Sequence, residues 1–360
     1  MEFGQIFTYI MLAFALIGAL DRCFGSKFGP GQAFEDGFGT MGPLVLAMVG
    51  INTVAPLLSK YLAPVLSPLC QSVGIDPSIV AGMLLANDSG GWPLAMALTQ
   101  DEEIGRLSGS LIGSVMGTAV LFTIPVGFSA TPAEKRRSVA LGLIIGLITL
   151  PIGCVAGGLF MGIGPIKLLR NLLPLIVLSL IFVVGLKFFE SITVTIIVWF
   201  GKLVTAGITV ALAIAIVMKQ LNRPIADLVP FDESLLVVGS IAIVLSGAFV
   251  MLFFVRLLFK KPLSVLGTRL SMNEASVVGM LTTMVNSIGT FGLMKDMNRR
   301  GVVVNTAFAV SGAFVLGDHV AFTASTEPSL VPVLIVGKMV GGAAAVAIAL
   351  LLTKNDTETE

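Results

Sequence analysis

Nine long apolar runs restrict what this chain can fold into more than any other feature. They are 3–20, 41–58, 105–127, 138–162, 171–189, 192–218, 234–256, 301–323 and 330–352. Each is close to the roughly 20 apolar residues that an α-helix needs to cross a bilayer. Charged residues make up only 12% of the chain, about half their share in ordinary soluble domains. The sequence therefore predicts an all-α integral membrane protein, with a polar tail at 354–360 and no soluble domain.

Two further apolar segments, 76–97 and 271–294, have polar centres. The first holds Asn87, Asp88 and Ser89 within GMLLANDSGGWPLAM, and two glycines and a proline follow closely. A carboxylate near the middle of a bilayer costs at least about 2.5–3.5 kcal/mol, so it survives only where it faces protein, water or a ligand. Gly and Pro break helices, and broken helices at membrane depth are typical of transporter sites. We therefore expect a substrate site at this break.

A weak repeat relates the two halves of the chain at a shift of about 197 residues. VAGMLLANDSGGWPLAM aligns with VVGMLTTMVNSIGTFGLM, which brings Asn87 near Asn286. The shift also places 3–20 on the end of 192–218, 41–58 on 234–256, 105–127 on 301–323, and 138–162 on 330–352. The repeat predicts two five-element units, 1–163 and 191–353, joined by a linker helix at 164–190.

Lys and Arg residues indicate how the two units are oriented. If 76–97 and 271–294 are re-entrant hairpins rather than full crossings, the second unit is inverted relative to the first. That topology places most of the 22 Lys and Arg residues on one side, whereas full crossings divide them almost evenly. Because positive charge concentrates on the cytoplasmic side, we expect nine spans, two hairpins, an outside N-terminus and an inside C-terminus.

In an inverted pair the two hairpin breaks lie near one another at the bilayer midplane. The second break carries Asn286, Ser287 and Thr290. Half-helix ends offer unpaired N–H and C=O groups to a solute, and Asn, Ser and Asp add side-chain partners. The alternative is that both breaks are packing glycines with locally satisfied polar groups.

A second polar cluster, GDHVAFTAS, lies near the end of the run 301–323. Asp318 and Phe322 stand four residues apart and share a helix face, so a carboxylate and an aromatic ring could together bind a cation. His319 is also a candidate site residue, although on a helix it points about 100° away from Asp318, so the two cannot both face one pocket squarely; it could relay protons. Alternatively, Asp318 pairs with His319 or with a distant lysine at the outer interface. Lys202 and Lys338 also lie within apolar runs, and either could neutralise a buried carboxylate or extend to the surface.

Several other classes of function find no support in the sequence. The net charge of +1 and the lack of a basic patch give no sign of nucleic-acid binding. Three cysteines without paired spacing and a single histidine indicate neither a disulfide framework nor a metal site. Neither a phosphate-binding GxxxxGK[ST] loop nor a GxSxG motif occurs. We therefore expect no enzyme activity and no cofactor.

Small residues form a second pattern in the run 105–127. Gly109, Gly113 and Gly117 recur every four residues, and the repeat places them on Asn305, Ala309 and Ala313. Such faces let two helices approach closely. They could serve internal packing or a homodimer, and the sequence does not choose between these.

Three stretches resemble the EutH family of ethanolamine utilisation membrane proteins: GMLLANDSGGWPLAMAL, GSLIGSVMGTAVLFTIPVG and GDHVAFTAS. The resemblance covers nearly the whole chain. It implies an ethanolamine permease of the bacterial inner membrane, with the lipid bilayer and a small cationic solute as its partners. It supplies no binding residues, so the site rests on the residues themselves.

Ethanolamine needs oxygen ligands for its ammonium and a partner for its hydroxyl. We expect Asp88, or alternatively Asp318, to bind the ammonium. The hydroxyl and the remaining N–H groups would fall to Asn87, Ser89, Asn286, Ser287 and Thr290. Trp92 either closes the pocket by cation–π contact or packs as an ordinary tryptophan. Alternating access is the expected mechanism; a carrier or channel for another small amine, a nucleoside or an ion, and a non-transporting scaffold, are the alternatives.

Overall fold

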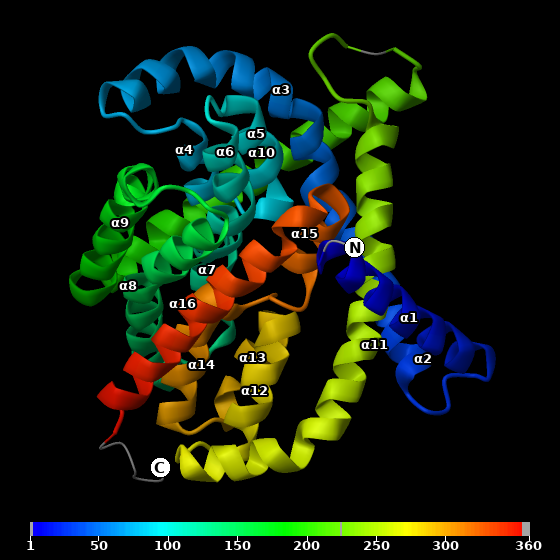
Figure 1. Cartoon of the computed structure of the whole chain (residues 1–360), viewed down its shortest axis with the longest axis vertical. Helices are drawn as coiled ribbons and strands as arrows, with labels where there is room; N and C mark the ends of the chain where they lie inside the picture. Colours follow the sequence, from blue (N-terminus) through cyan, green and yellow to red (C-terminus); the bar gives the residue numbers. More distant parts are fainter. Residues whose placement is uncertain (1–2, 224, 355–360) are drawn as a thin grey trace.

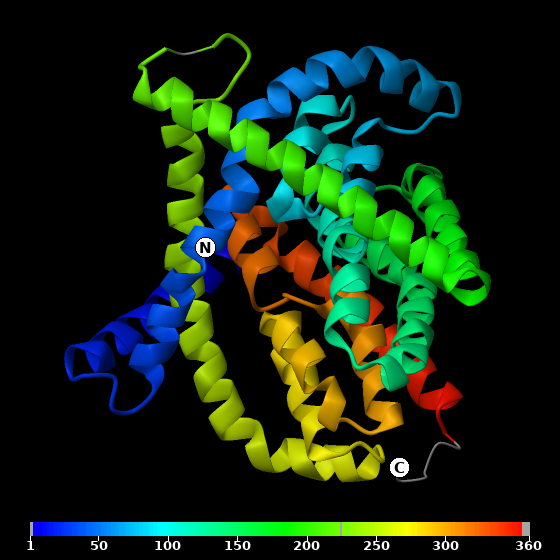
Figure 2. The same ribbon diagram turned by 180° about the vertical axis from the view of Figure 1, so that it is seen from behind.

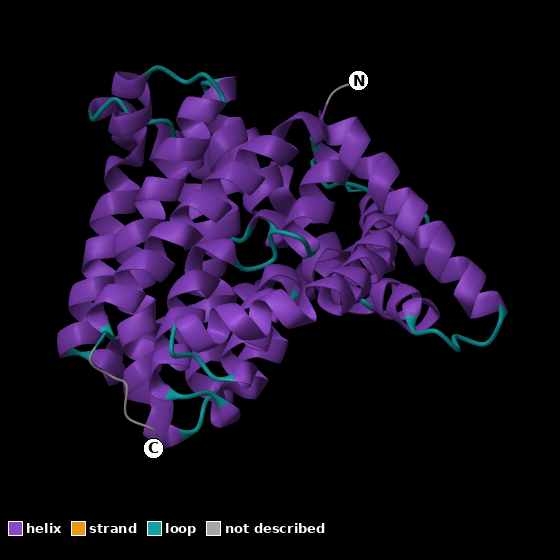
Figure 3. Cartoon of the chain, turned by 60° about the horizontal axis from the view of Figure 1, so that its bottom comes forward, coloured by secondary structure: helices purple, strands orange, loops and turns teal. Residues whose placement is uncertain are grey.

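The structure is a computed structural model, and it describes residues 3–223 and 225–354. Within these ranges the chain consists of helices and short loops, without a strand (Figure 3). Seven helices in the described part are long and apolar enough to cross a membrane. The predicted all-α membrane fold is therefore confirmed, while the count of nine spans stays a prediction. Apart from Lys354, the predicted polar tail lies outside the described residues.

The first half of the chain contains long helices around one short broken segment. Its elements are α1 (Phe3–Cys23), α2 (Pro30–Gly39), α3 (Met41–Ser72), α4 (Ser78–Leu84), η1 (Asn87–Ser89), α5 (Gly91–Leu98), α6 (Glu102–Leu107), η2 (Ser108–Gly117), η3 (Ala119–Thr123), α7 (Ile124–Ala130), η4 (Ala133–Lys135) and α8 (Arg136–Phe160). Helix α9 (Pro165–Phe188) follows at the position of the predicted linker.

The second half has a similar order of long and short elements. They are α10 (Glu190–Gln220), α11 (Phe231–Arg269), α12 (Glu274–Val285), α13 (Ser287–Leu293), η5 (Met294–Asp296), α14 (Arg299–Gly312), α15 (Asp318–Thr326), η6 (Pro328–Leu330) and α16 (Val331–Leu352). Helices α8, α14 and α16 pack against one another, and η2 lies against α16 and the first broken segment.

The last parts of the two longest helices, α3 and α11, lie at opposite ends of the molecule. The last part of α3 lies across the top in Figure 1, and the last part of α11 lies across the bottom. Their final residues, Ser72 and Arg269, are 197 positions apart, which is the shift of the sequence repeat. Two elements that correspond in sequence thus have opposite directions in space.

Glycine contacts cross between the two halves in a reciprocal way. A Cβ added to Gly50 in α3 would overlap the carbonyl oxygen of Ile208 in α10. A Cβ added to Gly247 in α11 would overlap the carbonyl oxygen of Met11 in α1. The repeat shift of 197 relates Gly50 to Gly247 and Met11 to Ile208. Each half therefore supplies the helix that packs on the other half's glycine.

Both polar-centred segments are broken helices that fold back on themselves. Helix α4 packs on α5, and α12 packs on α13. At the base of the first hairpin, Asp76 accepts hydrogen bonds from the backbone N–H groups of Gln100 and Asp101, both at 2.9 Å. At the base of the second, the Asn273 side chain donates to the Asp296 carbonyl at 2.7 Å. Figure 2 shows the two bases at opposite ends of the molecule.

We expect Asp76→Ala to destabilise the first hairpin more than removal of any exposed carboxylate. Asp76 is 7% exposed and also accepts from the Ser78 N–H at 2.9 Å. An unpartnered buried donor costs about 1–3 kcal/mol. Thermal unfolding of the purified protein in detergent measures the loss, with Glu103→Ala, an exposed partner of Lys167, as the control. Equal melting temperatures for the two variants would contradict this role of Asp76.

The apolar run 301–323 is not the continuous helix that the sequence predicts. Helix α14 ends at Gly312, α15 begins at Asp318, and the chain between them is extended or turned. The backbone N–H groups of Phe314 and Leu316 donate to the carbonyls of Thr283 and Met284 at 3.0 and 2.7 Å. These bonds to the end of α12 replace the bonds of a continuous helix and stabilise the break.

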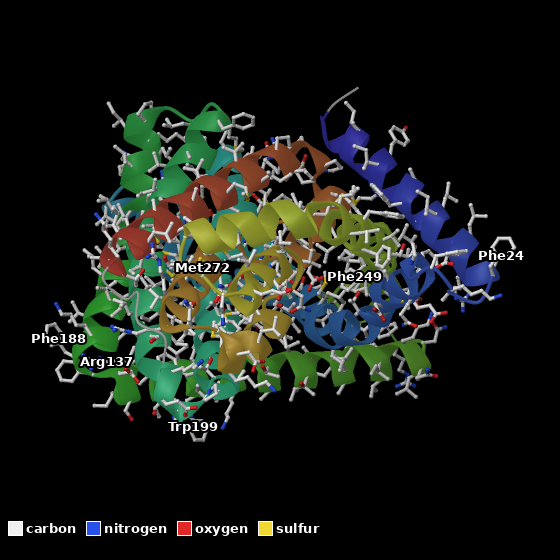
Figure 4. All side chains as sticks on the ribbon, turned by 90° about the horizontal axis from the view of Figure 1, so that it is seen from below. Phe24, Arg137, Phe188, Trp199, Phe249 and Met272 are labelled. Atoms are coloured by element: carbon white, nitrogen blue, oxygen red, sulfur yellow. The ribbon has the colours of Figure 1, made fainter. Side chains whose placement is uncertain are left out.

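Large apolar side chains cover the outside of the helices. Phe24, Phe188 and Trp199 lie at the edge of the molecule in Figure 4 and are 68, 64 and 60% exposed. A soluble protein rarely exposes so many large apolar side chains together. Lys202 extends outward over the Trp199 ring, with its Nζ 5.1 Å from the ring centre. This outer surface is suited to lipid, as the composition indicates.

Candidate functional site

The first helix break is formed by a single turn, η1, between α4 and α5. Leu85 and Ala86 are extended, and Gly90 has φ +100°, a conformation that disfavours residues with a side chain. Asn87 is fully buried, and neither its oxygen nor its nitrogen has a hydrogen-bond partner in the described part of the chain. Asp88 is half-buried and accepts a hydrogen bond from the Ser89 hydroxyl at 3.1 Å. The break thus presents one carboxylate and one unpartnered amide.

A wide helical turn supports this break from behind. Residues Ser108–Gly117 form a π-helix, η2, which is rare at this length and often marks a functional region. A Cβ at Gly113 would lie 3.0 Å from the backbone nitrogen of Asn87, and a Cβ at Gly117 would overlap the Leu85 carbonyl. The predicted small-residue face therefore packs inside the protein, where it lets the broken backbone approach η2.

The second break uses its polar groups differently. Asn286 caps α13, because its Oδ1 accepts from the Ile288 N–H at 2.9 Å. The Thr290 hydroxyl donates to the Gly279 carbonyl and accepts from Thr283, both at 2.8 Å. Ser287 is buried, and its hydroxyl has no partner within the described residues. Thr290 therefore stabilises the hairpin, whereas the Ser287 hydroxyl has unused hydrogen-bonding capacity among the described residues.

A third break, between α14 and α15, connects the two hairpins. A Cβ at Gly317 would overlap the carbonyl oxygen of Val285 at the tip of the second hairpin. Asp318 follows at the start of α15, which contacts η1 of the first hairpin. The charges of Asp318 and Asp88 interact, and Asp318 has no hydrogen-bond partner in the described ranges. Two carboxylates thus lie between the hairpin tips.

Behind the carboxylates lies a buried chain of polar groups. Lys338 of α16 is 0% exposed; its Nζ donates to the Ser114 carbonyl at 2.7 Å and lies 3.1 Å from His319 Nδ1. His319 Nε2 lies 3.3 Å from the Thr118 hydroxyl, which donates to the Gly113 carbonyl at 3.1 Å. The charges of Lys338 and Asp88 also interact. His319 therefore pairs with Lys338 and Thr118, and it does not pair with Asp318.

Two aromatic residues predicted for the site lie in one apolar cluster. Phe322 is buried, and Trp92 packs half-buried against the same cluster. Trp92 also packs against Gly109 of η2, where an added Cβ would lie 3.0 Å from the ring. The two rings therefore belong to one apolar cluster, to which α15 contributes several buried residues.

A groove of about 610 Å³ opens beside the second hairpin. It lies between α2, α11 and the end of α12, and its polar lining includes Gln32, Asp36 and Asn286. Asp36 is exposed, and Gln32 donates to it at 3.0 Å. The groove gives the tip of the second hairpin an open path to the surface.

The predicted site residues thus fall into three groups. The first group lies together at the first break: Asn87, Asp88, Ser89 and Asp318. The second group lies at the tip of the second hairpin, on the other side of the third break: Asn286 and Ser287. The third group contacts other parts of the protein: Thr290, His319, Trp92 and Phe322. Lys338 was not predicted as a site residue. The sequence feature that could have identified Lys338 as a site residue is its position within an apolar run, close to Gly337, Gly341 and Gly342.

Comparisons with known proteins agree with the earlier resemblance. The chain matches the family described as "Ethanolamine utilisation protein, EutH" over residues 3–352. It is 42% identical to "Probable ethanolamine permease EutH" of Listeria monocytogenes, over 98% of this chain and 95% of the relative. The Escherichia coli protein of the same name is 38% identical, over 100% and 98%. "Uncharacterized protein YxeR" of Bacillus subtilis is 39% identical, over 98% and 96%. No solved structure matches the chain.

Identities of this size over whole chains establish common descent and a common fold. The relatives are bacterial proteins, two of them named as permeases. Together with the seven apolar helices, they make this a multi-pass bacterial membrane protein. The chain belongs to the EutH family of ethanolamine utilisation proteins.

Proposed function

We propose that this chain is an ethanolamine permease of the inner membrane. The observation that carries the proposal is the buried Asn87 beside Asp88, because its amide has no partner among the described residues. A buried unpartnered amide costs free energy that a bound solute can recover. The carboxylate next to it attracts an ammonium group, and ethanolamine brings both an ammonium and a hydroxyl. The names of the relatives point to the same solute.

Each predicted ligand has a role that its surroundings allow. Asp88 binds the ammonium, with Asp318 as the alternative, and Asn87 and Ser89 bind the hydroxyl and remaining N–H groups. Ser287 offers its unpartnered hydroxyl once the two tips approach. Asn286 caps a helix at the groove and meets a solute that enters there. Thr290, His319, Trp92 and Phe322 act on the shape of the site.

Transport proceeds by alternating access in two inverted repeats, 1–163 and 191–353, joined by the linker 164–190. Support comes from the reciprocal contacts of Gly50 and Gly247 and from hairpin bases at opposite ends of the molecule. In this arrangement the hairpins 76–97 and 271–294 enter the bilayer from opposite faces, and their tips meet at mid-depth. The N-terminus is then outside and the C-terminus inside, as the distribution of Lys and Arg predicts.

Uptake into proteoliposomes tests the proposed function. Purified protein should take up labelled ethanolamine at a rate that saturates with concentration, and unlabelled ethanolamine should compete. Imposed proton or sodium gradients show whether uptake is coupled to an ion. A rate that rises without saturation indicates a channel, and competition by a different amine or a nucleoside at lower concentration identifies another solute. If the protein binds ethanolamine but the vesicles take up none, the protein is a non-transporting scaffold or sensor.

A further inference from the structure

Among the described residues, Lys338 is the basic side chain whose charge interacts with the carboxylate of Asp88. Its side chain is fully buried, so water does not screen it. The other titratable groups next to it are His319 on α15 and Cys154 on α8. Asp318, which precedes His319, interacts in turn with the charge of Asp88. Of these groups, Asp88 and Asp318 are carboxyls, Cys154 is a thiol and His319 is an imidazole, so Lys338 is the only amine among them.

The hydrogen bonds of Lys338 keep its ammonium in one place. Its Nζ donates to the Ser114 carbonyl at 2.7 Å, within the π-helix η2. An ammonium has donors only, so at 3.1 Å it donates to His319 Nδ1, which must then be the acceptor. The proton of the neutral imidazole is therefore on Nε2, where it faces the Thr118 oxygen at 3.3 Å. The hydrogen-bond partners of the ammonium, the Ser114 carbonyl and the neutral His319 ring, carry no charge. Its positive charge is therefore balanced only by the nearby carboxylate of Asp88.

We propose that Lys338 determines the charge of the solute, because it takes the place of a second ammonium and restricts the site to monocations. When all three groups are ionised, two carboxylates and one lysine carry a net charge of −1 between the hairpin tips. One ammonium group brings the buried site to neutrality, whereas a diamine leaves an unbalanced positive charge. Unpaired buried charge is costly. The inference rests on the proposed function and deepens it.

Two ligands of equal length test this selectivity in the intact purified protein. They are 3-aminopropan-1-ol and 1,3-diaminopropane, which differ in carrying a hydroxyl or a second ammonium. Each competes against labelled ethanolamine in an equilibrium binding assay. The parent protein should prefer the amino alcohol at least about tenfold, a difference of about 1.4 kcal/mol. A parent that binds both equally overturns the inference, whatever the variants show.

Removing the lysine should reverse the preference. Lys338→Met leaves both carboxylates without their internal cation, so the ratio of the two affinities should shift at least about tenfold towards the diamine. The double variant Asp318→Asn/Lys338→Met restores a net charge of about −1 and should recover the preference for the amino alcohol. Lys202→Met, at an exposed lysine over Trp199, is the matched control and should match the parent.

The outcomes separate this inference from the proposed function. A parent that binds neither ethanolamine nor the amino alcohol overturns the proposed function and the inference with it. Ethanolamine binding by the parent with an unchanged ratio in Lys338→Met overturns the inference alone. Loss of all binding in Lys338→Met without recovery in the double variant makes Lys338 a packing residue and also overturns it.

Discussion

Asp88→Asn is expected to reduce ethanolamine affinity at least about thirtyfold, which corresponds to the lower end of the ~2–5 kcal/mol lost when one partner of a buried charge pair is removed. Asparagine has nearly the same shape but no charge, so the ammonium loses its main electrostatic partner. The fold should persist, because the amide oxygen of the new side chain can still accept from Ser89, as Asp88 does at 3.1 Å. Saturable uptake into proteoliposomes and thermal unfolding measure the two effects.

The matched control is Asp227→Asn, which removes an exposed carboxylate that pairs with Lys60. Surface ion pairs contribute about 0–1 kcal/mol, and this one lies in a loop between α10 and α11, so uptake should be unaffected. Normal uptake by Asp88→Asn would remove Asp88 from the site. If Asp318→Asn instead abolishes uptake, the ammonium binds at the start of α15.

The fold class followed from the sequence because bilayer thickness limits what an apolar run can be. Hydropathy alone identified both polar-centred segments, and the breaks at Asn87 and Asn286 lie where Gly, Asn and Ser interrupt the runs. The break after Gly312 was missed because 301–323 contains no proline, and isolated polar residues such as Asn305 and Ser311 are compatible with a continuous helix. Its cause is the bonding of Phe314 and Leu316 to α12, a long-range interaction that leaves no local pattern.

The site was predicted less completely than the fold. Asn87, Asp88 and Ser89 could be found because polar residues are costly in lipid, and that same argument applies to Lys338. Hydropathy does not reveal which buried charges meet, so the proximity of Lys338 to Asp88 had to come from the packing of α16 on η2. The π-helix η2 was equally hidden, since its glycines fit an ordinary close-packed helix.

Gly50→Ala and Gly247→Ala are each expected to destabilise the protein by about 1–3 kcal/mol or more, the usual cost of overpacking. In both cases the new methyl group would overlap a backbone carbonyl, that of Ile208 or that of Met11. A backbone oxygen cannot rotate away as a side chain does, so two long helices must separate. Because these contacts join the two halves of the chain, the loss should appear in thermal unfolding and in uptake.

Two glycines that lie about two helical turns earlier in the same helices provide matched controls. Gly42 in α3 and Gly239 in α11 have open space where a Cβ would lie, and the repeat shift of 197 relates them. Alanine there should be neutral or stabilising by up to about 1 kcal/mol, the helix preference for Ala over Gly. If the halves are inverted copies, Gly50→Ala and Gly247→Ala should cost similar amounts. A large loss in one variant and none in the other would contradict the reciprocal packing on which the alternating-access proposal depends.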